Sequence, residues 1–135
     1  MKSYLRVRCN KAYLANIREF VRSRLDELEV EGKLREQIVL AVDEACANCM
    51  IHSHQCDNYS SLEIAVFIEE NTLWAEIKDP AKAFPMHTYQ PRDLMEIVRL
   101  KTKGGLGINL IHKIMDEIKI EESADHCIYI LGKNL

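Results

Sequence analysis

Hydrophobic residues in this chain follow two periodicities in turn, and their order along 135 residues constrains the fold more than any other feature. Alternation with a period of two indicates half-buried strands, whereas steps of three and four residues indicate amphipathic helices. Alternation occurs in residues 3–9, 61–68 and 72–78, and in two short segments near 119–122 and 127–132. Helical spacing occurs from about residue 10 to 28, from about 34 to 53, and after residue 107. The predicted order is therefore β-α-α-β-β-loop-α-β-β.

This order predicts an α+β fold, a two-layer α/β sandwich in which three helices cover one face of a mostly antiparallel sheet. Glu70 and Asn71 separate two alternating segments and predict the tight turn of a hairpin. The chain has no internal repeat or linker, and its length suits one domain, so residues 1–135 are expected to form a single domain. Trp74 lies in the hairpin and is predicted to serve packing, either within the domain or at a dimer interface.

Composition excludes several classes of protein. The net charge of −3 argues against broad nucleic-acid binding, and the chain has no apolar run of about 18 residues that could span a membrane. The first residues lack an apolar signal segment, and the cysteine count of five is odd, so we expect a cytoplasmic protein without a disulfide framework. Arg18, Arg22 and Arg24 lie off the apolar stripe of the first helix and are expected to face solvent.

Three polar residues of the second helix are spaced by four: Glu44, Asn48 and His52. Each step of four drifts only about 40° around a helix axis, so their side chains form one strip beside the apolar stripe. A carboxylate and an amide at a half-buried helix edge need partners. A Mg²⁺ ion with oxygen ligands and a role as general base would both satisfy that need. The alternative is a polar strip that simply faces water.

A glycine-rich segment, Lys101-Thr-Lys-Gly-Gly-Leu-Gly-Ile-Asn109, opens the third predicted helix. Glycines allow backbone N–H groups to approach phosphates closely, and a helix N-terminus favours anions. Lys101 and Lys103 add positive charge beside it. The segment is not a Walker motif, because no Gly-Lys-Ser/Thr follows four variable residues. A glycine-rich helix start without a phosphate ligand is the alternative.

Asp79 ends the second strand of the hairpin, where its carboxylate could accept a hydrogen bond from an adenine amino group. The alternative is an ordinary strand-ending aspartate before a turn. From Pro80 to Lys103 the periodicity is weak, and a mostly irregular segment of this length in a compact domain is typical of a functional lid.

The order of these segments resembles the ATPase domain shared by gyrase, histidine kinases and MutL, often called the Bergerat fold. Two longer segments, Leu40–His52 and Gly104–Glu117, are more specific. They resemble the anti-sigma serine kinases of bacterial stress-response and sporulation switches. The resemblance extends over nearly the whole chain, from the first predicted strand to the last.

The resemblance implies an ATP- and Mg²⁺-dependent protein kinase. Asn48 would coordinate Mg²⁺, Glu44 would be the general base, and Asp79 would bind the adenine amino group. Backbone N–H groups of Gly105 and Gly107 would bind the phosphates beneath a mobile lid. The nucleotide-binding residues implied in this way are Asn48, Asp79, Ala81, Lys103, Gly104, Gly105, Leu106 and Gly107.

The resemblance also implies protein partners. The phosphate acceptor would be a serine or threonine of a small anti-anti-sigma protein, and a homodimer of this domain would bind a sigma factor. No nucleic-acid or membrane partner is expected. The chain departs from the family at Ala81 and Ala83, where glycines are usual. This departure favours the alternative function, a non-catalytic interaction module that sequesters a sigma factor or another regulator.

A zinc site is a further alternative, since Cys46 and Cys49 form a Cys-x-x-Cys pair that is followed by His52, His54 and Cys56. Cys49 falls on the apolar stripe of the helix and Cys46 at its edge, away from His52. Small buried thiols therefore explain the two cysteines better.

Overall fold

The computed structural model describes residues 3–50, 61–80, 103–122 and 126–135. Its five strands form one sheet with the order β1-β2-β3-β5-β4, and every neighbouring pair is antiparallel. The strands are β1 (Tyr4–Arg8), β2 (Ser61–Glu69), β3 (Thr72–Asp79), β4 (Glu117–Glu122) and β5 (Cys127–Asn134).

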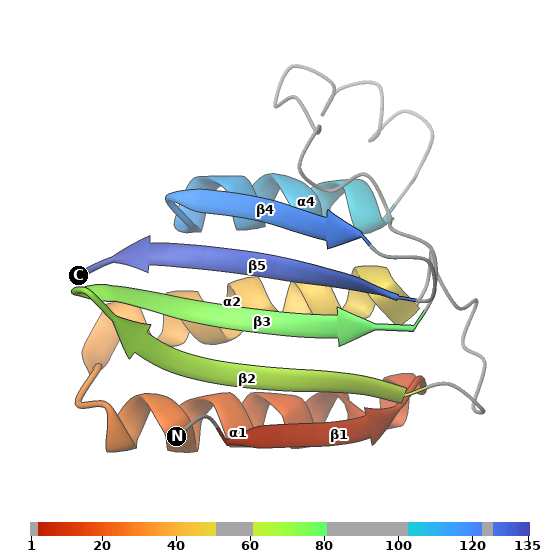
Figure 1. The fold of residues 1–135 in the computed structure, drawn as a ribbon, viewed down its shortest axis with the longest axis horizontal. Coiled ribbons are helices and arrows are strands. Elements are labelled where there is room, and N and C mark those ends of the chain that lie inside the picture. The colour runs from red at the N-terminus through yellow and green to blue at the C-terminus, as the bar shows by residue number, and fades with distance from the viewer. Residues whose placement is uncertain (1–2, 51–60, 81–102, 123–125) are drawn as a thin grey trace.

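The helices lie together on one face of this sheet (Figure 1). They are the short 3-10 helix η1 (Lys11–Tyr13) and the α-helices α1 (Leu14–Glu27), α2 (Gly32–Asn48) and α4 (Lys103–Ile114). The predicted α+β class, with a sheet covered on one face, is therefore confirmed. In the described parts of the chain, no helix is both long enough and apolar enough to cross a bilayer.

The core lies between the helices and the sheet. Every second residue of the central strands points into it, and the stripes of α1 and α2 meet them from the other side. Each fully buried aliphatic side chain contributes about 1.5–3 kcal/mol to folding, so this layer supplies most of the driving force. The fully buried large side chains are Ile17, Leu25, Ile38, Met50, Leu62, Ile64, Leu73, Ile77, Ile111, Tyr129 and Leu131.

Two local features of the backbone, a hairpin turn and a helix cap, follow from the residues at those positions. Glu70 and Asn71 join β2 to β3 with φ angles of 50° and 64°, which is the conformation of a two-residue hairpin turn. Asn10 caps the first helical turn, where its side-chain oxygen accepts the N–H of Ala12 at 2.9 Å. The predicted first helix is in fact η1 followed by α1.

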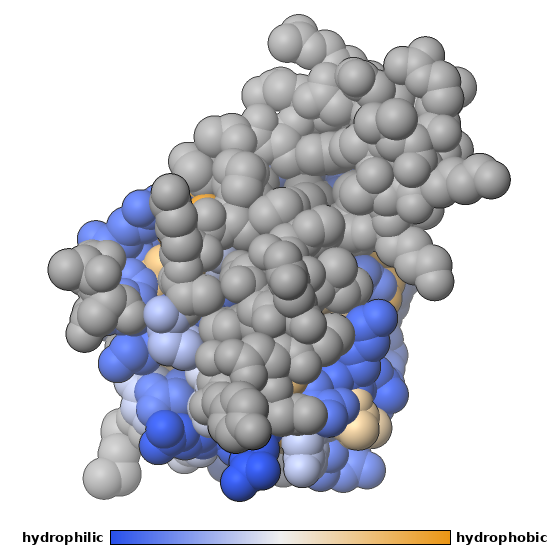
Figure 2. Space-filling view, turned by 90° about the vertical axis from the view of Figure 1, so that its right-hand side faces the viewer, coloured by the Kyte–Doolittle hydropathy of each residue, from blue (hydrophilic) through white to orange (hydrophobic). Residues whose placement is uncertain are grey.

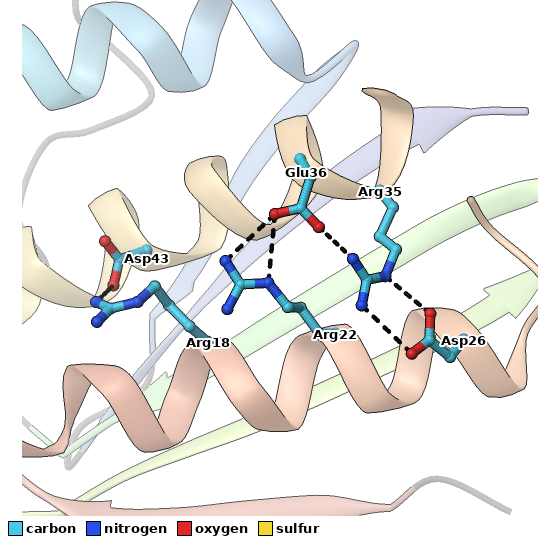
Figure 3. A network of polar contacts seen from close by, with 6 residues as sticks. All are labelled: Arg18, Arg22, Asp26, Arg35, Glu36 and Asp43. Atoms are coloured by element: carbon cyan, nitrogen blue, oxygen red, sulfur yellow. Dashed lines mark hydrogen bonds and ion pairs between the residues drawn. The ribbon is translucent and has the colours of Figure 1, made fainter. Parts of the chain in front are cut away.

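Ion pairs link α1 to α2 along their outer side (Figure 3). Most of these side chains are at least a quarter exposed, so each pair is expected to contribute at most about 1 kcal/mol. The pairs between the two helices are Arg18–Asp43 at 3.1 Å, Arg22–Glu36 at 3.2 Å and Arg35–Asp26 at 2.8 Å. Within α2, Arg35 also pairs with Glu36.

Arg24 does not face solvent, contrary to the sequence-based expectation. Its side chain is only 12% exposed, and its Nε and Nη2 atoms donate to the carbonyl oxygen of Val66 at 3.2 and 3.0 Å. β1 pairs with β2 only as far as Tyr4 opposite Ala65, so the carbonyl of the next residue is bound by the arginine instead. The aliphatic stem of an arginine can cover apolar surface while its head reaches a polar group, which residue spacing alone does not reveal.

Replacing Arg24 with methionine is expected to lower the free energy of unfolding by about 1.5–3 kcal/mol, because a charged donor to a backbone carbonyl is lost. The matched control is Arg22→Met in the same helix, where an exposed ion pair is lost at a cost of less than about 1 kcal/mol. Urea denaturation of both variants measures the difference. Equal destabilisation would show that Arg24 is no more than another surface arginine.

Candidate functional site

Three elements end at the same end of the molecule, on the right in Figure 1. They are the C-terminus of α2, the C-terminus of β3 and the N-terminus of α4, and α2 packs against α4. Asn48, Asp79 and Lys103 are the last or first residues of these elements. Figure 2 looks onto this end, where the described residues at the rim are largely hydrophilic. The fold thus brings together three segments that are far apart in the sequence.

Asn48 is the last residue of α2 and is 1% exposed. Its side-chain Nδ2 has no hydrogen-bond partner within the described part of the chain. A buried polar group without a partner costs about 1–3 kcal/mol, so the amide is expected to serve a ligand. The interpretation of this strip as a wet helix face is wrong for Asn48.

Glu44 lies one turn before Asn48 and is partly buried. Burial raises the pKa of its carboxyl group above the ordinary value, and the negative charge of neighbouring Asp43 raises this pKa further. Arg18 pairs with Asp43 at 3.1 Å. A carboxylate with a raised pKa is a stronger base than an ordinary glutamate, as proton abstraction near neutral pH requires.

Asp79 is 0% exposed, although it ends a strand. Its Cα pairs in register with that of Cys127 in β5. Burial, and then the negative charge of Asp79, raise the pKa of the Cys49 thiol well above its ordinary value. Asp79 does end β3, as both interpretations of the sequence had it, and the structure adds that the side chain is buried there. A buried carboxylate at the rim of a sheet is instead suited to a ligand that can donate hydrogen bonds.

The three glycines of the glycine-rich segment lie within the first turns of α4. The helix begins at Lys103, five residues before the predicted start after Gly107, because the first residues of a helix need no intrahelical N–H partner and glycine is tolerated there. The N–H groups of Lys103, Gly104 and Gly105 therefore belong to the unpartnered first turn, which favours anions. Gly107 is the fifth residue of this helix, so its N–H can bond within the helix.

Some predicted residues lie outside the described residues, and their roles stay predictions. They are Ala81, Ala83, His52, His54, Cys56 and the whole lid segment. Cys46 and Cys49 are fully buried, and no group of three or more His, Cys, Asp or Glu side chains that could hold a metal ion occurs in the described segments. Sequence reasoning treated the Cys49 thiol only as core packing and missed its electrostatic coupling to the site, since burial and the charge of Asp79 together raise its pKa.

The chain matches the family model of the histidine kinase-like ATPase domain over residues 7–130, and it belongs to that family. Within this class it is similar to the serine-protein kinase RsbW of Bacillus licheniformis, with 28% identity over 90 residues, which cover 64% of this chain and 56% of that protein. The RsbW of Bacillus subtilis is likewise 28% identical over 90 residues. The predicted resemblance to serine-protein kinases is therefore confirmed, although the chain spans little more than half the length of these relatives.

A solved structure supports the same fold. The SiaB–SiaC complex from Pseudomonas aeruginosa contains a chain that matches with a TM-score of 0.64 and 12% identity, covering 97% of this chain and 88% of that one.

Replacing Glu44 with glutamine is expected to raise Tm at neutral pH. Because the folded-state pKa of Glu44 lies above its unfolded value, the wild type loses stability relative to the variant as pH rises through that interval. The gain should be below about 1 kcal/mol, since the side chain is partly solvated. Thermal unfolding near pH 3 is the control. At that pH Glu44 is protonated in both the folded and the unfolded state, so the difference in Tm between the wild type and the variant should vanish. A lower Tm of the variant at neutral pH would contradict this role of burial.

Proposed function

We propose that this chain binds Mg-ATP where α2, β3 and α4 end together and transfers a phosphoryl group to a serine or threonine of an anti-anti-sigma partner protein. The observation that carries the proposal is the burial of Asn48 and Asp79 at this one end, beside the N-terminus of α4. Relatives named serine-protein kinases support the reaction class.

The residues at this end fit both ATP and Mg²⁺. Asn48 offers an amide oxygen, and Mg²⁺ favours oxygen ligands from one or two side chains together with phosphates. The unpartnered Nδ2 of the same amide marks a polar group that the fold has buried for a ligand. Asp79 would accept a hydrogen bond from the adenine amino group, and the first turn of α4 would bind the phosphates.

Glu44 would take the proton from the attacking hydroxyl group. Its raised pKa makes it a stronger proton acceptor, while its partial burial keeps competing water away. The backbone N–H groups at the start of α4 would hold negative phosphate oxygens in place. When bound, Mg-ATP supplies the phosphoryl group and the metal charge that stabilises it, so positioning by these residues is the protein's main contribution.

The proposed partners are an anti-anti-sigma protein and a sigma factor, in a cytoplasmic setting. The structural relative was solved as a complex of SiaB with SiaC, which supports a protein partner for this fold. The helix-free face of the sheet would form the homodimer. On this face the ring of Trp74 lies so close to Gly132 that an added Cβ would be 2.6 Å from it.

The rival function is a non-catalytic module that binds nucleotide or a regulator without phosphoryl transfer. Ala81 and Ala83, in place of the usual glycines, favour it. The partly buried Glu44 with its raised pKa favours the kinase, because an adaptor has no use for a base at this position.

Replacing Asn48 with alanine is expected to weaken ATP binding about tenfold or more in the presence of Mg²⁺, since one oxygen ligand is lost. Without Mg²⁺ the variant and the wild type should bind ATP about equally. Calorimetric titration with and without EDTA measures both. Asn48→Asp serves as a second variant, because it keeps the shape and an oxygen ligand. An affinity that is unchanged in both variants would remove Asn48 from the site.

Mixing the protein with labelled ATP and a candidate anti-anti-sigma protein from the same genome is expected to transfer the label. Glu44→Gln should reduce the rate by a factor of about 100 or more, since general-base catalysis is lost, while ATP affinity stays within about twofold. Asp43→Asn is the matched control at the neighbouring position. It keeps the base and should shift the acidic limb of the rate profile to lower pH. ATP binding without transfer in the wild type would leave the non-catalytic module as the function.

A further inference from the structure

A single leucine interrupts the charged outer side of α2. Leu40 is 39% exposed, and no other large apolar side chain among the described residues of α1 and α2 is as exposed. Exposed leucines are common on protein surfaces and need no explanation by themselves. The position of this one is informative, because Leu40 comes one helical turn before Glu44, the proposed general base.

Helix geometry places Leu40 between two different neighbours. At about 100° per residue, Leu40 lies about 60° from Asp43 in one direction around the helix and about 40° from Glu44 in the other. Asp43 is on the side that faces α1, where it pairs with Arg18 at 3.1 Å (Figure 3). The leucine therefore separates the ion pairs between α1 and α2 from the carboxyl group of Glu44.

On the α1 side of Leu40 the charges are paired with one another. Glu36, one turn before Leu40, pairs with Arg22 at 3.2 Å, and Asp43 pairs with Arg18. Because each carboxylate has a cation from the opposite helix, this side carries little net charge. A side chain that packs on Leu40 beside these pairs would lose its water, so an apolar side chain fits there and a charged one does not.

We propose that Leu40 is a specificity-determining residue for the phosphate-acceptor protein, and that it contacts an apolar side chain of the acceptor segment close to the serine or threonine that approaches Glu44. This inference rests on the proposed function, because it requires Glu44 to meet an acceptor hydroxyl group. The occupant of the surface at Leu40 is thus the acceptor protein, and not a second copy of this chain.

The spacing on α2 determines where this apolar side chain stands in the acceptor. Four residues of an α-helix rise about 6 Å, which is the separation of Leu40 and Glu44 along the axis. In an extended segment, side chains two positions apart point to the same side and are separated by about 6.6 Å. An extended acceptor segment that lies along α2 therefore brings its hydroxyl group to Glu44 and the side chain two positions away to Leu40.

Ile68 provides the matched control. It is an apolar side chain of nearly the same exposure, 37%, in β2. It lies next to the hairpin turn at the start of β3, whereas Asp79 ends that strand at the candidate site. Replacing Ile68 therefore removes a comparable exposed apolar surface without changing α2 or its neighbours.

The test measures kcat and KM for a candidate anti-anti-sigma protein from the same genome, with saturating labelled Mg-ATP. We expect Leu40→Gln to raise KM about tenfold, with kcat and ATP affinity within about twofold of the wild type, because an apolar contact outside the reacting atoms contributes to acceptor binding alone. Leu40→Met keeps an apolar side chain of similar volume and should retain the wild-type KM, as should Ile68→Gln. Thermal unfolding shows which variants are folded.

A double-mutant cycle locates the contact in the acceptor. Mass spectrometry identifies the labelled serine or threonine, and the apolar residue two positions from it is replaced with glutamine. This change should raise KM about tenfold with the wild type and less than about twofold with Leu40→Gln, because the contact is already lost there. An acceptor with polar residues at both positions of this spacing would contradict the inference.

Other results would also overturn the inference alone. They are an unchanged KM in folded Leu40→Gln, an equal rise of KM in Ile68→Gln, and a changed oligomeric state of Leu40→Gln in sedimentation, which would assign the leucine to a contact between copies. Failure of the wild type to transfer any label would instead overturn the proposed function, and this inference with it. The wild type and the Leu40 variants thus report on the two claims separately.

Discussion

The burial of an amide and a carboxylate at one end of a largely apolar core is the constraint on which the candidate site depends. Asn48 and Asp79 are at most 1% exposed, whereas the core cluster of the described residues is made of apolar side chains, thiols and Tyr129. Polar groups in such a place destabilise the fold unless they find partners. The packing of α2 on α4 and the pairing of β3 with β5 hold them there, so the same interactions that stabilise the domain also shape the site.

Electrostatics at this end favour a nucleotide only together with a cation. Asp43, Glu44 and Asp79 are acidic, and the C-terminus of α2 adds the negative end of a helix dipole. A triphosphate placed there alone would meet like charge on one side and the positive N-terminus of α4 on the other. Mg²⁺ between the phosphates and α2 would remove that repulsion. The charge distribution thus accounts for a ligand that is bound as its magnesium complex.

Local patterns in the sequence predicted what local interactions determine. The alternation in β2 and β3 and the Glu70-Asn71 turn were correct, since strand faces and hairpin turns depend on neighbouring residues. The common strip of Glu44 and Asn48 also followed from helix geometry. Contacts between distant elements could not be read this way. Arg24 bonds a carbonyl 42 residues away, and the burial of Asn48 and Asp79 arises only when the helix layer closes over the sheet.

In the proposed function, nucleotide binding and catalysis depend on different residues of this site, so the two can be separated. Replacing buried polar groups with apolar ones of similar size is often neutral or stabilising, so a chain that only bound a protein would have no physical need for Asn48 or Asp79 in its core. Their burial therefore argues for a bound ligand in either version of the function. Catalysis depends instead on Glu44, which remains partly exposed and carries a raised pKa. Burial and the charge of Asp43 disfavour the ionised form of this carboxyl group. A kinase would use this property, because the carboxylate must accept a proton from a partner's hydroxyl group, whereas an adaptor would not. The raised pKa therefore favours the kinase over the adaptor.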